Sequence, residues 1–146
     1  MPTLENDVLV FRFPETEPEA SVSISFQRTF RIPDTDKTYG LPPGFGNFPV
    51  RHAEDYLQKL SSKATERSGV ILPMWQSEAM WIHFDCGSDY SSSMPPFPVA
   101  IKVAAGKINA VTGEAWRKGL HRAPQDYMVA PEQPWLDAPS RASRIL

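Results

Sequence analysis

Two stretches of the sequence combine aromatic rings with carboxamide, carboxylate and imidazole groups. They are PMWQSEAMW (73–81) and HRAPQDYMVAPEQPWLD (121–137), and prolines stiffen the backbone in both. Flat rings beside hydrogen-bonding groups on a fixed backbone are typical of sites that bind a small ligand or a peptide. The sequence therefore predicts a non-catalytic binding surface that comprises Trp75, Gln76, Glu78, Asn109, His121, Gln125, Asp126, Tyr127, Gln133 and Trp135.

Two other interpretations of these stretches stay open. In the first, His121 and Asp126, which lie five positions apart in one loop, act as the acid–base pair of a small hydrolase-like or lyase-like enzyme. In the second, the rings pack loops onto a β core, which is the commonest use of Trp and Tyr, and the chain is a structural fragment without a ligand. The leading interpretation assigns no catalytic residue, no metal and no cofactor.

The segment PFPVAIKVAAGK (96–107) contains VAIK, which in protein kinases marks the strand whose lysine holds the nucleotide phosphates. A kinase also needs a glycine-rich loop one hairpin upstream and two catalytic aspartates downstream. The segment GFGNFPV (44–50) has Pro49 in place of the third glycine and lies too far upstream, and LHRAPQDY (120–127) has Ala123 in place of the aspartate. We therefore exclude a kinase site and predict that Lys102 is an exposed strand lysine.

Three further patterns lack the residues that their chemistry requires. The segment HFDCGSD (83–89) has no paired ligand spacing, and neighbouring strand residues such as Asp85 and Cys86 point to opposite faces. Cys86 has no basic neighbour that would activate the thiol, so we predict a small, inert core residue. Gly106 and Lys107 lack the phosphate-binding frame, which leaves a turn with Gly106 at positive φ.

Charge and cysteine content restrict the class of protein. Fifteen basic and 17 acidic residues give a net charge of −2, which excludes general attraction to nucleic acid or to an anionic membrane. The first residues lack the basic region and long apolar core of a signal peptide and no apolar run reaches membrane-spanning length, so we expect neither a leader nor a membrane span. The single cysteine fits a reducing compartment. We expect a soluble cytoplasmic protein whose partner is a small ligand or another protein.

The elements that must position these residues are short. Fifteen prolines in 146 residues disfavour long helices. VSISFQRTFRI (22–32) alternates apolar and polar residues, which predicts a strand with one buried and one wet face, broken only by Arg28. VLVFRF (8–13) predicts another strand. Residues 49–60 place Val50, Ala53, Leu57 and Leu60 on one stripe, which predicts a short amphipathic helix.

Two hairpins complete the predicted fold. Residues 69–86 read as two strands around a polar turn, with a buried helix over 76–84 as the alternative. VAIKV and KINAV (99–103 and 107–111) predict a second hairpin, and EAWRKGLH (114–121) could form one helical turn. The sequence thus predicts an α+β fold: a β-rich single domain of about six strands in antiparallel hairpins with one short amphipathic helix.

The segments PMWQSEAMW, GKINAVTG, LHRAPQDY and QPWLD occur in this order along the chain. Together they resemble a family of uncharacterised microbial proteins, over about residues 28–137. The members continue past a QPWLDG segment, whereas Ala138 replaces that glycine here, so the resemblance implies an N-terminal part. We therefore expect one domain over residues 1–137, a flexible tail over 138–146, and self-association through an open strand edge.

Overall fold

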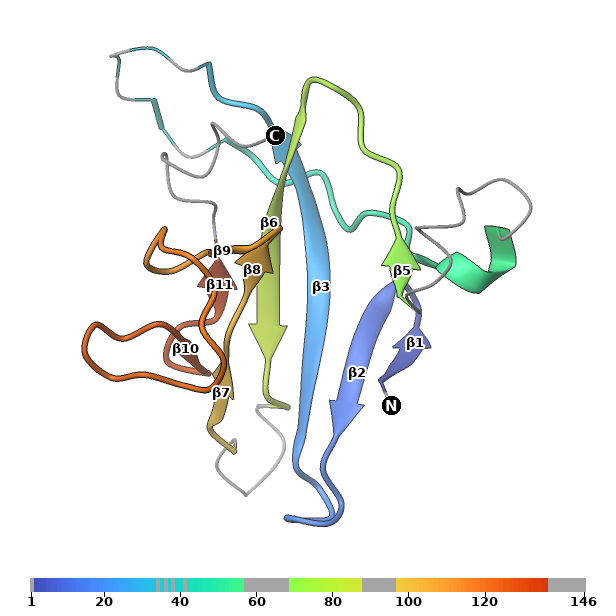
Figure 1. The fold of residues 1–146 in the computed structure, drawn as a ribbon. Helices are drawn as coiled ribbons and strands as arrows, with labels where there is room; N and C mark the ends of the chain where they lie inside the picture. The colour runs from blue at the N-terminus through green and yellow to red at the C-terminus, as the bar shows by residue number, and fades with distance from the viewer. Residues whose placement is uncertain are drawn as a thin grey trace.

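The computed structural model describes residues 2–33, 35, 37, 39–40, 42–56, 69–87 and 97–136. This part of the chain is β-rich and its paired strands are all antiparallel, as the sequence predicts (Figure 1). Its strands are β1 (Thr3–Glu5), β2 (Val8–Arg12), β3 (Ser21–Phe30), β4 (Arg51–His52), β5 (Val70–Ile71), β6 (Glu78–Asp85), β7 (Val99–Ile101), β8 (Ala104–Ala105), β9 (Ile108–Asn109), β10 (Met128–Ala130) and β11 (Trp135–Leu136).

The largest sheet has the strand order β1-β2-β3-β6-β11. Its centre is the long pairing of β3 with β6, in which Ile24 lies opposite Phe84 and Phe26 opposite Ile82. Because residues opposite each other in a ladder share a face, these four side chains lie on one apolar face. Leu9 extends that face onto β2, since it pairs with Ile24.

The other face of β3 is less exposed to solvent than its sequence predicts. Ser25 and Thr29 lie on it, yet both are buried. Thr29 donates its hydroxyl proton to the carbonyl of Pro43, which lies in the segment that crosses this face. At the end of the apolar row the pattern also fails, because Phe30 is exposed. Alternation along a strand thus predicted which side chains share a face, but not what covers each face.

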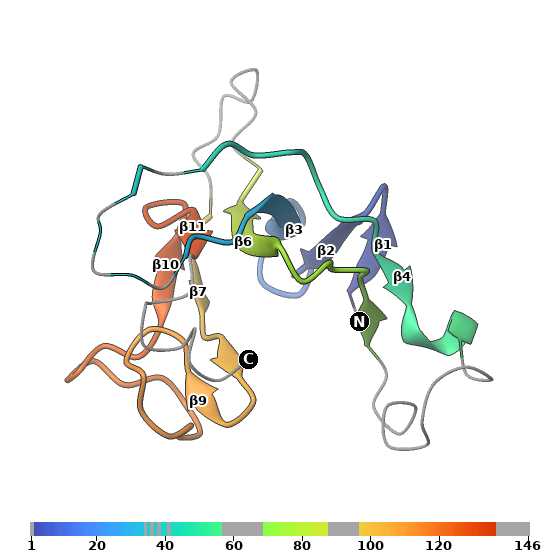
Figure 2. The same cartoon turned by 90° about the horizontal axis from the view of Figure 1, so that it is seen from above.

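Strands β7 and β10 form a separate pair beyond the β11 edge of the large sheet. Figure 2 shows that this pair turns out of the plane of the sheet toward its apolar face. Where the two layers meet lies a small core of Val22, Phe84, Cys86, Met128 and Ala130. Partly buried side chains of β2, β3, β6 and β7 pack against this core.

The predicted amphipathic helix is not confirmed. In the described part of this segment, residues 49–56, Arg51–His52 form strand β4 and Ala53–Tyr56 form a single 3-10 turn. Phe48 and Val50, which bracket Pro49, are fully buried, and the N–H of Val50 donates to the carboxylate of Asp7. Long-range pairing of this segment therefore overrides its helical stripe. Residues 57–60 of the predicted helix lie outside the described residues.

Both predicted hairpins pair differently from the expectation. β6 is a strand, not the alternative helix, but its partners are β3 and β11, and β5 pairs with β4. β7 pairs with β10, while the turn at Gly106, whose φ is +63°, joins the two-residue strands β8 and β9. Residues 114–121 contain no helical turn. In the described part of the chain, no helix is long and apolar enough to cross a membrane.

Candidate functional site

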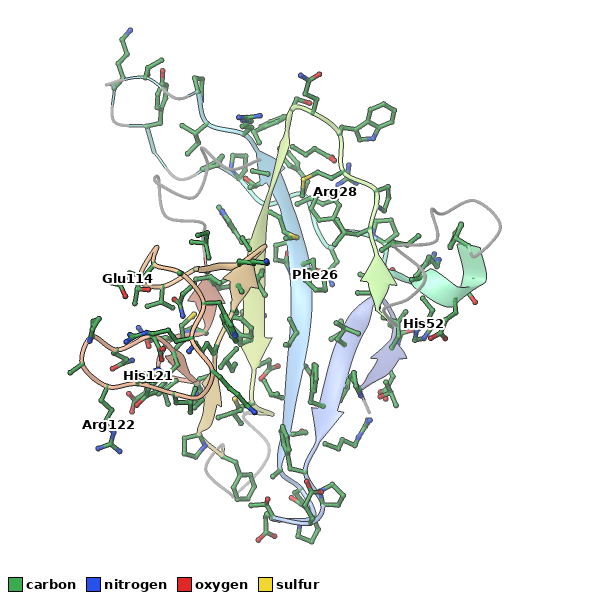
Figure 3. All side chains as sticks on the ribbon, in the orientation of Figure 1. Phe26, Arg28, His52, Glu114, His121 and Arg122 are labelled. Carbon is green, nitrogen blue, oxygen red and sulfur yellow. The ribbon has the colours of Figure 1, made fainter. Side chains whose placement is uncertain are left out.

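The ten predicted binding residues fall into three groups rather than one surface. Trp75, Gln76 and Glu78 lie at the turn that enters β6, while Gln133 precedes β11 and Trp135 begins it, opposite His83 toward the far end of β6. The other five lie in the segment between β9 and β10 and at its ends. Figure 3 shows His121 in the loops beside β7, away from Arg28 near the upper end of β3. At about 3.3 Å per strand residue, the turn of Trp75 is more than ~15 Å from Trp135 along β6.

The group at the β6 turn is tied into the sheet through Glu78. Its carboxylate accepts hydrogen bonds from the N–H of Trp75, at 2.9 Å, and from the Arg28 guanidinium. The hydrogen bond from the Trp75 N–H lowers the pKa of Glu78 most, and the bond from the Arg28 guanidinium lowers it further. The ion pair also gives Arg28 a partner on the apolar face, where its guanidinium lies 5.5 Å from the Phe48 ring centre. Glu78 therefore holds the turn, and the 74% exposed Trp75 side chain projects from it.

The second group surrounds a buried ion pair that the sequence did not predict. Lys102, expected on the surface, has only 6% of its side chain exposed, and Asp126 has 3%. The three ammonium protons reach Asp126 Oδ2, the carbonyl of Arg117 and the carbonyl of Gly119, each at 2.6 Å. The Trp116 ring lies 4.6 Å from the same nitrogen. The ammonium has no further proton to donate, so Lys102 anchors the 116–126 segment and is not available to a phosphate.

His121 and Asp126 are in contact, as the enzyme interpretation requires. His121 Nδ1 lies 2.7 Å from Asp126 Oδ2, and the His121 N–H donates to Oδ1 at 2.8 Å. Burial of Asp126 opposes its ionisation, but hydrogen bonds from Lys102 and from the backbone and ring of His121 outweigh burial and hold its pKa far below the usual value. The ionised carboxylate accepts the Nδ1 proton, which leaves Nε2 of the half-exposed imidazole free.

Asn109, Gln125 and Tyr127 complete the second group. Asn109 is buried, donates to the carbonyl of Asp126 and accepts from the N–H groups of Val111 and Thr112. The exposed Gln125 donates to the carbonyl of Tyr127 at 2.8 Å. Asn109 is thus a structural link between β9 and β10.

Two residues outside the ten predicted binding residues, Trp81 and His83, lie beside the third group. The Trp135 ring, half exposed, lies 4.1 Å from the His83 ring and 6.2 Å from the Trp81 ring, measured between ring centres. His83 pairs with Trp135 across β6 and β11, which places them on the face opposite Phe84. Gln133 accepts a hydrogen bond from the N–H of Val129 through its side chain. The alternation of β6 could have identified this aromatic row, had β11 been known as its neighbour.

The described residues also form an apolar groove on the opposite face of the large sheet. It has a volume of about 460 Å³ and lies between the sheet and β7. Its lining is Leu9, Phe11, Phe13, Val22, Ile24, Phe26, Ile82, Phe84 and residues 99–104. The sequence identified several of these side chains as core, but the open space among them depends on where β7 lies, and no local pattern predicts that.

The described residues offer little to a metal or a reactive thiol. No group of three or more His, Cys, Asp or Glu side chains within them is placed to hold a metal ion. Cys86 is buried, as predicted, and burial together with the nearby Asp85 raises the pKa of its thiol. A raised pKa disfavours the thiolate, which is the nucleophilic form.

Comparisons with known proteins add no further assignment. No family model matches the sequence, no curated protein is similar to it, and no solved structure matches the fold. The resemblance to the family with the PMWQSEAMW, GKINAVTG, LHRAPQDY and QPWLD segments therefore stays a prediction.

Proposed function

We propose that this protein is a non-catalytic binding module and that the apolar groove between β7 and the large sheet is its ligand site. The observation that carries this proposal is the groove itself: about 460 Å³, lined by aliphatic and aromatic side chains. This volume falls within the range of small-ligand sites, which are mostly apolar. The proposal also places the protein in the cytoplasm, which the single free cysteine supports.

The partial exposure of the sheet centre supports a ligand at this position. β3 and β6 are the central strands of the large sheet, yet Ile24, Phe26 and Ile82 are only partly buried. Apolar side chains at the middle of a sheet are normally covered, because water contact with them costs about 25 cal/mol per Å². A bound apolar group would remove this contact.

The buried ion pair supports the proposal because it anchors one of the residues that line the groove. Residues 99–104 line the groove, and one of them, Lys102, binds the carboxylate of Asp126 through its ammonium group. The polar network of Lys102, Asp126 and Asn109 thereby fixes the groove wall, and the Lys102 charge within it is paired with the carboxylate of Asp126. In this proposal the second group of predicted binding residues acts by positioning β7.

The experiment is a titration with N-phenyl-1-naphthylamine, a neutral dye that fluoresces in apolar surroundings. Leu9→Glu places a carboxylate in the groove, and Val10→Glu is its matched control, since Val10 is the next residue of β2, also half-buried, on the opposite face. We expect dye affinity to fall at least about tenfold in Leu9→Glu and to stay within about twofold in Val10→Glu. Equal affinities for both variants would contradict the groove as the site.

A second candidate function rests on the 2.7 Å contact between His121 Nδ1 and Asp126 Oδ2. A carboxylate that orients an imidazole in this way leaves Nε2 able to accept a proton from a substrate or water. We expect His121→Ala to slow any hydrolysis of p-nitrophenyl esters by at least about 100-fold. An unchanged rate, or no hydrolysis by the wild type, would remove this candidate.

A further inference from the structure

Strand β7 has one paired edge and one unpaired edge among the described residues. It pairs with β10 through Val99 with Ala130, Ala100 with Val129, and Ile101 with Met128. The N–H of Val129 donates to the side-chain oxygen of Gln133, and the C=O of Val129 accepts from the backbone N–H of Gln133. Val129 therefore does not exchange hydrogen bonds with Ala100. In an antiparallel ladder, the backbone groups of such a non-bonded position point away from the partner strand. The N–H and C=O of Ala100 therefore point to the free edge.

Lys102 continues the same edge. The carbonyl of Val103 accepts from the N–H of Ala110, so it faces the paired side, and the alternation of the chain turns the backbone of Lys102 to the free side. Lys102 makes no backbone–backbone hydrogen bond within the described part of the chain, and the alternation of the ladder leaves the N–H and C=O of Ala100 without a partner on β10. Both residues line the groove. Backbone donors and acceptors that have no partner among the described residues thus lie along one wall of an apolar space.

These two features together suit one kind of occupant. A strand that pairs with Ala100 and Lys102 would point every second side chain into the groove, toward Ile24, Phe26 and Ile82. Strand addition of this kind uses backbone hydrogen bonds for affinity and alternate side-chain pockets for specificity. A small apolar molecule would fill the groove but leave the edge of β7 without partners.

We infer that the groove takes an extended segment of a partner protein, with apolar residues at alternate positions, as an added strand on the free edge of β7. This inference rests on the proposed function and names the class of its ligand. A second copy of this chain, or a small apolar molecule, would be a different occupant, and each gives a different result in the experiment below.

The experiment removes one backbone donor and leaves the groove intact. Ala100→Pro eliminates the N–H that points to the free edge, while the ladder bonds to β10, which run through Val99 and Ile101, remain. Ala100→Val is the matched control, because it keeps the N–H and adds a β-branched side chain suited to a strand. The probe is a phage-displayed library of random twelve-residue peptides selected on the wild-type chain, with N-phenyl-1-naphthylamine as the second probe.

We expect the enriched peptides to alternate apolar and polar residues, and to bind Ala100→Pro at least about tenfold more weakly than wild type and Ala100→Val. Dye affinity should be the same in all three proteins. Enriched peptides that bind Ala100→Pro equally well, or no enrichment beside intact dye binding, would overturn the added strand but keep the groove. A dimer in gel filtration that Ala100→Pro abolishes would identify a second copy and overturn the partner peptide. Absence of dye binding in the wild type would instead refute the proposed function.

Discussion

Replacing Asn109 with alanine separates a structural role from a binding role for this residue. Asn109 is buried and makes three hydrogen bonds, one to the carbonyl of Asp126 and two from the N–H groups of Val111 and Thr112. A typical hydrogen bond in a protein contributes about 1 kcal/mol net, so Asn109→Ala should lower the free energy of unfolding by about 3 kcal/mol. For a chain of this size, about 2–4 °C per kcal/mol gives a fall in Tm of about 6–12 °C.

The assay is thermal unfolding followed by circular dichroism, repeated in urea to obtain the free energy of unfolding. Gln125→Ala is the control, because its exposed side chain makes one hydrogen bond to the carbonyl of Tyr127. We expect this control to change the free energy of unfolding by less than about 0.5 kcal/mol. If Asn109→Ala melts within about 2 °C of the wild type, Asn109 does not link β9 to β10 and the argument for a structural network is refuted.

Three further predictions test the network and the core. The pKa of Asp126 is lowered in the fold, so its ionised carboxylate stabilises the protein above the unfolded pKa of about 4, and this stabilisation is lost as the pH falls. Asp126→Asn should therefore flatten the acid side of a plot of Tm against pH, and a plot as steep as that of the wild type would contradict this. Phe84 is buried and Trp75 is exposed, so Phe84→Ala should lower the free energy of unfolding, measured in urea, by about 3–5 kcal/mol and Trp75→Ala by less than about 0.5 kcal/mol. Similar losses for the two variants would contradict this difference in burial. Cys86 should react with iodoacetamide far more slowly in native buffer than in urea, whereas equal rates would place its thiol on the surface.

The sequence predicted the strands whose signal is local. β2, β3 and β6 appear where apolar residues alternate or run together, and Gly106 takes the positive φ expected at its turn. A glycine in a turn and a period of two are properties of a few neighbouring residues. They depend little on the rest of the fold.

Partner choice among the strands could not be predicted in the same way. β7 pairs with β10, about thirty positions later, and β5 pairs with β4 rather than with the adjacent β6. Strands β4, β5, β7 and β10 have only two or three residues each. So few positions carry too little pattern to specify a register, and tertiary packing decides it.

The predicted site residues show the same difference between contacts set by local sequence and contacts set by long-range packing. His121 and Asp126 are brought together because they lie in one loop, whereas Trp75 and Trp135 lie apart because β6 separates them. Lys102 was wrongly placed on the surface, because the prediction treated it as a strand residue without neighbours. Its burial depends on the 116–126 segment, whose fold no local pattern indicated.

The most direct test of the groove as the ligand site is a methyl NMR titration with selectively labelled isoleucine. Ile24, Ile82 and Ile101 line the groove, whereas Ile32 and Ile108 lie outside its lining. On addition of N-phenyl-1-naphthylamine, we predict that the methyl signals of the first three shift together, saturate at one equivalent, and leave the other two unchanged. Shifts at Ile32 and Ile108 with none at Ile24, Ile82 and Ile101 would contradict the account.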